Sequence, residues 1–412
     1  MKHSGSLWAL CLAFSWIFAA EAVAGSAGHT SPLWNYYNRA DFFALRAALP
    51  VQTSGETDET AFLRAATSSA FAQPAASARR LEQLLNRPLT DTALDIQTRE
   101  LLMLDRRALF RYRGALDAVA PLLRGPQQNE RVRSIENRAR LLRAIADVEP
   151  QTVTVGNRMP IFPDSRGHIA VSINRRPVPM FIDTGANLSV LPRGIARALG
   201  LTIRPANYAV GSSVGGRVAG DVAVGDLAFA DGTRVRNAIF LILPDNAVPV
   251  ALLGYPVISA LGSIEYSGGG IILGSGARTS GSTALALSGN DLLLRARYGG
   301  QDLLCRLDSG SGRSVFYAPF YRRFSSSLLD SSRKSLRVGG ATGTYKFGTR
   351  QVPSLTITVA GRAFRLAPAT VFTEPVRDVP NQALACNIGR DVLSTARDYR
   401  IDFANMTFGF GS

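Results

Sequence analysis

Two short aspartate motifs are the residues of this sequence whose type and setting are best suited to chemistry. Asp183 opens an Asp-Thr-Gly sequence, and Asp308 opens an Asp-Ser-Gly sequence. Each aspartate follows a short apolar run that is typical of a buried strand. A carboxylate at the end of such a strand is unfavourable unless it is protonated or hydrogen-bonded. The glycine two residues later has no Cβ, so its backbone can lie close to a second carboxylate and donate an N–H to it.

Two such turns that face each other would share one proton between their aspartates, because adjacent like charges do not both ionise easily. The ionised carboxylate would take a proton from a water molecule held between the two groups. The protonated one would hydrogen-bond the scissile carbonyl of a peptide. This reaction forms no covalent enzyme adduct, and we expect no metal and no cofactor. The residues expected to support the two loops are Thr184, Gly185, Ser309, Gly310 and Ser311.

The sequence lacks the residues and motifs that other classes of hydrolase require. Histidine occurs only at His3, His29 and His168. The first lies in a segment that we expect to be removed and the second lies close to the new N-terminus, so a nucleophile activated by histidine would depend on His168 alone. The sequence contains no His-Glu-x-x-His, no paired cysteine spacing and no phosphate-binding Gly-x-x-x-x-Gly-Lys run. Carboxylate chemistry therefore remains.

The two motifs lie in segments that resemble each other. Residues 183–190 and 308–315 are identical at four of eight positions, at an offset of 125. Downstream, Leu252-Leu-Gly corresponds to Asn387-Ile-Gly, and Ile264-Glu-Tyr corresponds to Ile401-Asp-Phe. In both segments, short β-branched runs separated by Gly, Asn, Asp and Pro predict strands joined by hairpins. Because the same features occur twice in the same order, we expect a duplicated β-rich domain.

These motifs resemble the retropepsin-like aspartic proteases, including bacterial members with an N-terminal helical region. Residues 181–190 look like the family's catalytic loop, and residues 252–254 and 388–393 look like the motif that follows its flap. The resemblance covers about residues 150–412. It implies a mainly β fold in which two closed β lobes form one pepsin-like bilobal unit, and it implies an aspartic endopeptidase with the two aspartates as its catalytic pair. The glycines that fit the family's flaps are Gly215, Gly216, Gly339 and Gly340.

Two asymmetries lie close to the aspartates. Phe181 and Arg306 each stand two residues before an aspartate, so strand alternation places both side chains toward the substrate cleft. We therefore hypothesise one apolar and one basic subsite, with an acidic or amide side chain preferred beside Arg306. Ser311 can donate a hydrogen bond to its loop or carboxylate, whereas Ala186 cannot. This difference predicts that the aspartate of the second loop is the more anionic member of a pair that titrates as a unit.

Five segments are expected along the chain. A basic start, an apolar stretch and a small-x-small site at residues 22–24 predict a signal peptide. Helical spacing, as in Leu81, Leu84 and Leu85, predicts helices before Pro150. A Gly- and Ser-rich run predicts a linker between the β segments. The expected segments are a signal peptide (1–24), a helical domain (25–149), a first aspartic protease lobe (150–275), a linker (276–283) and a second lobe (284–412).

The composition limits the expected partners. The 412 residues carry a formal net charge of +15, almost all of it from arginine. Without a Lys/Arg block or a basic stripe with aromatic residues, we expect a peptide or protein substrate and no nucleic acid. The predicted signal peptide indicates an exported protein, periplasmic or secreted, with a bacterial envelope favoured, and we expect no membrane span after signal removal. Because both lobes lie in one chain, we expect a monomer. Cys305 and Cys386 could then form a disulfide or remain buried thiols.

Two other functions stay open at this point. The first lobe has Tyr255-Pro256 where the second has Arg390-Asp391, so its post-flap motif is incomplete. A protease fold that binds peptides without cutting them would fit that departure. Alternatively, each lobe could pair with a lobe of another molecule. The helical segment could be a removable inhibitory region, a scaffold that recruits substrates or a folding partner.

Overall fold

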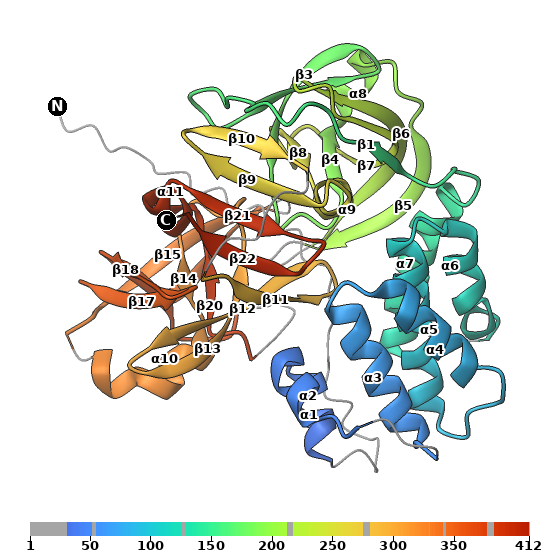
Figure 1. Ribbon diagram of the computed structural model, residues 1–412, viewed down its shortest axis with the longest axis horizontal. Coiled ribbons are helices and arrows are strands. Elements are labelled where there is room, and N and C mark those ends of the chain that lie inside the picture. The colour runs from blue at the N-terminus through green and yellow to red at the C-terminus, as the bar shows by residue number, and fades with distance from the viewer. Residues whose placement is uncertain are drawn as a thin grey trace.

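A computed structural model describes residues 31–51, 55–125, 129–211, 217–274, 281–328, 330–340, 343–376 and 383–411. Helices come first in the chain and strands dominate from residue 152 onward, as the sequence predicts (Figure 1). The predicted signal peptide, most of the linker at 276–283 and the flap residues Gly215 and Gly216 lie outside the described residues.

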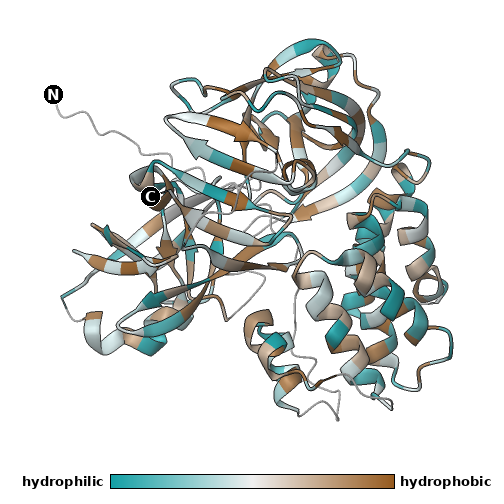
Figure 2. Ribbon diagram, in the orientation of Figure 1, coloured by the Kyte–Doolittle hydropathy of each residue, from teal (hydrophilic) through white to brown (hydrophobic). Residues whose placement is uncertain are grey.

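The N-terminal region consists of helices that bury one face. Asp91 begins the longest of them by accepting hydrogen bonds from the N–H groups of Ala93 (2.8 Å) and Leu94 (3.1 Å), which would otherwise lack partners. In their core, the ring of Trp34 stacks on that of Phe62 with centroids 5.5 Å apart. Each helix carries both hydrophilic and hydrophobic residues (Figure 2), as expected for half-buried helices. None of the described helices is long and apolar enough to cross a membrane. The helices are α1 (Pro32–Asn38), α2 (Phe42–Ala48), α3 (Asp58–Ala70), α4 (Pro74–Leu84), α5 (Thr92–Ala108), α6 (Tyr112–Val119) and α7 (Glu130–Ala144).

The first β unit, residues 152–273, contains a closed six-stranded barrel. Its elements are β1 (Thr152–Thr154), β2 (Ile169–Ile173), β3 (Arg176–Ile182), β4 (Ser189–Pro192), α8 (Arg193–Ala198), β5 (Arg204–Gly211), β6 (Arg217–Phe229), β7 (Arg234–Leu243), β8 (Ala251–Leu253), α9 (Tyr255–Ala260), β9 (Ser263–Ser267) and β10 (Gly270–Leu273). The barrel order is β7-β4-β8-β3-β2-β6, and β6 closes it by pairing with β7. Ile169, Val171 and Ile173 are buried at every second position of β2, which is the period expected of a strand with one face in the core.

The second β unit, residues 283–410, repeats this succession of pairings. Its elements are β11 (Thr283–Ser288), β12 (Asp291–Tyr298), β13 (Gln301–Leu307), β14 (Val315–Phe316), α10 (Ala318–Phe324), β15 (Ser332–Gly340), β16 (Gly343–Val352), β17 (Leu355–Val359), β18 (Arg362–Leu366), β19 (Ala369–Phe372), β20 (Cys386–Ile388), α11 (Arg390–Ala396), β21 (Tyr399–Asp402) and β22 (Thr407–Phe410). The order β12-β13-β20-β14-β19-β16 matches β2-β3-β8-β4-β7-β6. Where the first unit has the long strand β6, the second has β16 and β17, which are interrupted at Pro353 because proline has no N–H for the ladder. β17 then pairs with β12.

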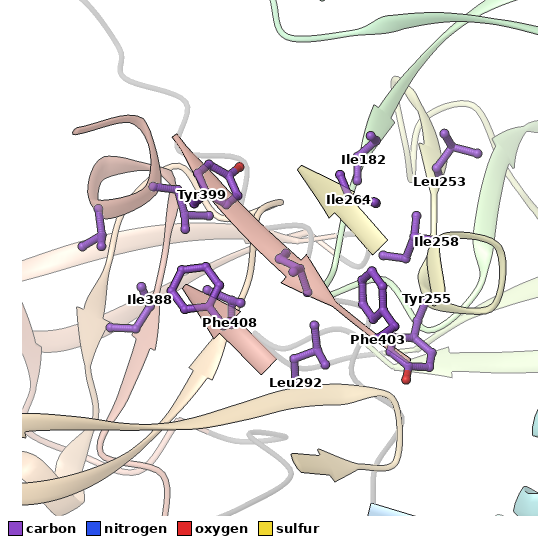
Figure 3. Close-up of a cluster of buried hydrophobic side chains, with 14 of the residues drawn as sticks. Ile182, Leu253, Tyr255, Ile258, Ile264, Leu292, Ile388, Tyr399, Phe403 and Phe408 are labelled. Carbon is purple, nitrogen blue, oxygen red and sulfur yellow. The ribbon is translucent and has the colours of Figure 1, made fainter. Parts of the chain in front are cut away.

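One sheet joins the two units. Strands β9 and β10 of the first unit continue through β21 into β22 and β11 of the second. Tyr266 on β9 lies opposite Tyr399 on β21, and their rings stack with centroids 4.3 Å apart. Figure 3 shows side chains of both units in one apolar cluster, with Ile264 and Tyr255 on one side and Leu292 and Phe408 on the other. The two aspartate loops are therefore attached to one continuous β structure.

The helical region packs against the β structure. Helix α7 lies along β5, where the side-chain amide of Asn137 accepts a hydrogen bond from the N–H of Ala209 and donates one to its carbonyl, both at 2.8 Å. An ion pair of 2.6 Å joins Asp41 of the helical region to Arg295 of β12. A cavity of about 520 Å³ lies at this junction, and residues of both β units line it together with the helices. Neither Asp183 nor Asp308 lines this cavity.

Candidate active site

Each of the two candidate aspartates begins a loop at the end of a central strand. Asp183 follows β3 and Asp308 follows β13. The N–H of Asp183 donates to the carbonyl of Leu253 at 3.0 Å, and the N–H of Asp308 donates to the carbonyl of Ile388 at 2.9 Å. The neighbouring strands β8 and β20 thus anchor the two loops in the same way. Both aspartates are buried.

The two loops hold each other through reciprocal hydrogen bonds. The hydroxyl of Thr184 donates to the carbonyl of Leu307 (3.2 Å) and accepts from the N–H of Ser309 (2.9 Å). The hydroxyl of Ser309 donates to the carbonyl of Ile182 (2.9 Å) and accepts from the N–H of Thr184 (3.1 Å). Each hydroxyl therefore bridges from its own loop to the other. The sequence predicts that these residues support the loops, but it does not predict that the bonds cross between the units.

Glycine is required in each loop because the partner carboxylate lies against it. A Cβ placed on Gly185 would be 2.7 Å from Oδ1 of Asp308, closer than side chains approach one another. A Cβ on Gly310 would likewise collide with the carboxylate of Asp183. The glycine N–H groups serve their own loops, since Gly185 donates to Asp183 Oδ1 at 2.8 Å and Gly310 donates to Asp308 Oδ1 at 3.0 Å. The structure thus brings the two sequence motifs together.

The environment of Asp183 favours its protonated form. Burial, and then the negative charge of Asp308, raise the pKa of Asp183 well above its usual value. Its Oδ1 accepts the glycine N–H, whereas its buried Oδ2 has no hydrogen-bond partner among the described residues. A protonated Oδ2 would be a hydrogen-bond donor without a protein acceptor, which is the state needed to bind a carbonyl oxygen.

Arg306 differs from the open basic subsite that strand alternation predicts. Its side chain does lie on the same face as Asp308, but it is only 5% exposed. Nη2 lies 2.6 Å from Asp308 Oδ2, and Nε donates to the side-chain oxygen of Asn387 at 2.8 Å. Nη1 lies 3.4 Å from the carboxylate of Asp291. The prediction of a subsite open to a substrate side chain is wrong, because polar groups on the neighbouring strands β12 and β20 bind the guanidinium inside the protein.

Asp291 and Asn387 are site residues that the sequence analysis missed. Asp291 is the first residue of β12 and belongs to no motif, so only the fold places it near the second loop. Asn387 stands where the first unit has Leu252, and this exchange of an apolar residue for an amide was a signal available in the sequence.

Phe181 occupies the position in the first unit that corresponds to Arg306. It is half-buried, and its ring lies 4.9 Å from the guanidinium carbon of Arg390 in the second unit and 6.4 Å from the ring of His168. Phe181, near the end of β3, is thus bordered by a residue from each unit. Whether a substrate contacts Phe181 remains a prediction.

The incomplete post-flap motif of the first unit corresponds to a different way of bracing the loop. In the second unit, Asp391 accepts hydrogen bonds from the N–H (2.8 Å) and hydroxyl (2.6 Å) of Ser314. In both units the serine hydroxyl accepts a bond from a glycine N–H, Ser189 from Gly254 at 3.1 Å and Ser314 from Gly389 at 3.0 Å, but the first unit has no carboxylate at the position of Asp391. Tyr255 packs edge-on against Phe403, with ring centroids 5.9 Å apart. Aromatic packing thus takes the place of the carboxylate.

The other predicted residues fall into three groups. Cys305 and Cys386 face each other in the parallel pairing of β13 with β20 and form a disulfide. The N–H of Ser311 donates to Asp308 Oδ1 at 3.1 Å, and its hydroxyl donates to the carbonyl of Arg313 at 2.8 Å, so the hydroxyl braces the loop. Gly339 and Gly340 lie at the end of β15, where they pair with β16 in a hairpin.

Comparisons with known proteins agree with the first aspartate motif. The aspartyl protease family matches residues 169–257. Among solved structures, the EIAV protease complexed with the inhibitor HBY-793 is 26% identical, covers 23% of this chain and 86% of its own, and has a TM-score of 0.20. A retropepsin-like aspartic protease from Rickettsia conorii is 16% identical, covers 30% of this chain and 94% of its own, and has a TM-score of 0.23. No curated protein matches the chain. The matched segment includes the first aspartate loop and β8, so the part of the chain that carries Asp183 is similar to the aspartyl protease family.

Proposed function

We propose that this protein is an aspartic endopeptidase in which the two β units form a pepsin-like pair of lobes and Asp183 and Asp308 activate water together. The observation that carries the proposal is the reciprocal bonding of the two loops, which places the glycine of each loop against the carboxylate of the other. The repeated order of strand pairings supports an origin by tandem duplication. Since both loops come from one chain, a second molecule is not needed to complete the pair.

The proposed reaction uses the two aspartates in different roles. Asp308, ionised beside Arg306, takes a proton from the water while the oxygen of that water bonds to the scissile carbonyl carbon. Asp183 gives its proton to the carbonyl oxygen, which leaves a neutral gem-diol. Asp308 then passes the proton that it received to the leaving nitrogen, and one diol hydroxyl returns its proton to Asp183 as the C–N bond breaks. The sum is the addition of one water molecule to one peptide bond.

The test is cleavage of a diverse peptide pool from acidic to neutral pH by the processed protein. Asp183→Asn and Asp308→Asn should each abolish cleavage, because each removes one of the two proton-transfer groups. Asp302→Asn is the matched control, since Asp302 lies on the same strand β13 but its side chain is 52% exposed. Equal cleavage by all four proteins would refute the proposed pair. No cleavage by the unaltered protein at any pH, together with retention of peptides, would favour a binding protein instead.

A further inference from the structure

A buried charge cluster surrounds one of the two candidate catalytic aspartates and not the other. Asp308 Oδ2 contacts Arg306 at 2.6 Å and lies 3.5 Å from the side-chain nitrogen of Asn387. Arg306 also contacts Asp291 at 3.4 Å. The side chains of Arg306, Asp291 and Asp308 are each no more than 5% exposed. Water therefore does little to weaken the attraction between these charges.

The corresponding places beside Asp183 are apolar. The first unit has Phe181 at the position of Arg306 and Leu252 at the position of Asn387. The sheet registers agree with this correspondence, because Phe181 lies opposite Leu252 in the pairing of β3 with β8, and Arg306 lies opposite Asn387 in the pairing of β13 with β20. Two substitutions between otherwise similar units thus leave Asp308, and not Asp183, in hydrogen-bond contact with a cation.

We infer that Arg306 is a positioning residue that divides the catalytic roles, since its contact keeps negative charge on Asp308 and leaves Asp183 as the proton donor. The inference rests on the proposed protease function and adds the cause of the asymmetry. It replaces the hydroxyl of Ser311, which donates to the carbonyl of Arg313, as the source of the bias. Asn387 fixes the orientation of the guanidinium, because it accepts a bond from Nε while Nη2 points to Asp308.

The groups that face Arg306 decide how this cluster responds to pH. They are Asp291 from β12, Asp308 and Asp183 from the two loops, and Tyr317 before α10. Burial disfavours the charge of Arg306, but the carboxylates of Asp308 and Asp291 outweigh burial and raise its pKa, so it stays charged at every working pH. Burial raises the pKa of Asp291 to about 6, even though Arg306 opposes that rise. Below about pH 6 Asp291 is therefore neutral, and the guanidinium charge acts on Asp308 with less competition.

The experiment compares three variants by the pH dependence of kcat/KM on one peptide. Arg306→Leu removes the cation, so the midpoint of the acidic limb should shift to higher pH by at least about one unit. At a fixed pH on that limb, this shift is about a tenfold loss of activity. Arg306→Lys keeps a positive charge, so its acidic limb should shift less than that of Arg306→Leu. Asp291→Asn is the control: Asp291 is already neutral below about pH 6, so an acidic limb below that pH should stay in place. A merely structural role of Arg306 would lower activity at every pH without moving the limb.

A second measurement reads the roles without activity. NMR of isotope-labelled aspartate carboxyls, assigned with Asp183→Asn and Asp308→Asn, follows each proton directly. We expect Asp308 to stay ionised to a lower pH than Asp183, and we expect the order to weaken or invert in Arg306→Lys or Arg306→Leu. An unchanged order in a folded Arg306 variant, or Asp183 ionising first in the unaltered protein, would overturn the inference. Because this readout needs no cleavage, failure of the inference and failure of the proposed protease function are separate results.

Discussion

The crossed hydrogen bonds between the two aspartate loops should make a measurable contribution to stability. Thr184→Val keeps the shape of the side chain but removes its hydroxyl, which is a donor to Leu307 and an acceptor for Ser309. Thr184 is fully buried. Each buried group that loses its partner costs about 1–3 kcal/mol, so the variant should lose about 2–6 kcal/mol of unfolding free energy. At roughly 2 °C per kcal/mol for a region of this size, Tm should fall by about 4–12 °C.

The assay is thermal unfolding followed by near-ultraviolet circular dichroism, because it reports side-chain packing in the β units. Thr184→Ser is the matched control: it retains the hydroxyl and loses only a methyl group, so its Tm should stay much closer to that of the unaltered protein. Ser309→Ala should resemble Thr184→Val, because it removes the reciprocal pair of bonds. If Thr184→Val unfolds at the same temperature as Thr184→Ser, the crossed bonds contribute nothing and the reasoning fails.

Two further predictions concern buried groups outside the loops. Burial raises the pKa of Asp105 in α5 from 3.8 to about 7, so the unfolded chain releases this proton before the folded one and stability falls as pH rises between these values. Above pH 7, Asp105→Asn removes the free-energy cost of burying this charge, which is about 4 kcal/mol. Thermal unfolding at about pH 4 and pH 8 should therefore show that the variant is stabilised only at the higher pH. Equal stabilisation at the two pH values would contradict the prediction. Replacing Cys305 and Cys386 with serine should cost about 2–4 kcal/mol, and reductant should lower the urea midpoint of the unaltered protein only.

The two aspartate loops could be predicted from the sequence because their information is local. An apolar lead-in, an aspartate, a hydroxyl residue and a glycine lie side by side in the chain, and the motif occurs twice. The partners of Arg306 could not be predicted in this way. Strand alternation gives the face on which Arg306 lies, but its depth depends on Asp291 and Asn387, which reach it only through the registers of β12 and β20.

The same limit applies to the boundary between helices and strands. Helical spacing before Pro150 and short β-branched runs after it predict where the helical region ends. Spacing does not predict that one apolar cluster contains Leu141 of α7 together with Tyr208 and Leu252 of the first β unit. A removable inhibitory segment would be only loosely attached to the β units. The shared core therefore favours a helical region that persists in the folded protein.

The bond between Asn137 and Ala209 has a consequence for self-association. Strand β5 lies at the end of its sheet, and an unpaired strand edge can template the addition of a strand from another chain. The amide of Asn137 satisfies both backbone groups of Ala209 and so occupies part of that edge. Asn137 precedes Ala209 by 72 residues, so helix α7 is synthesised before strand β5, whose edge it covers in part. The order of the segments thus makes the protecting helix available before the edge strand is complete.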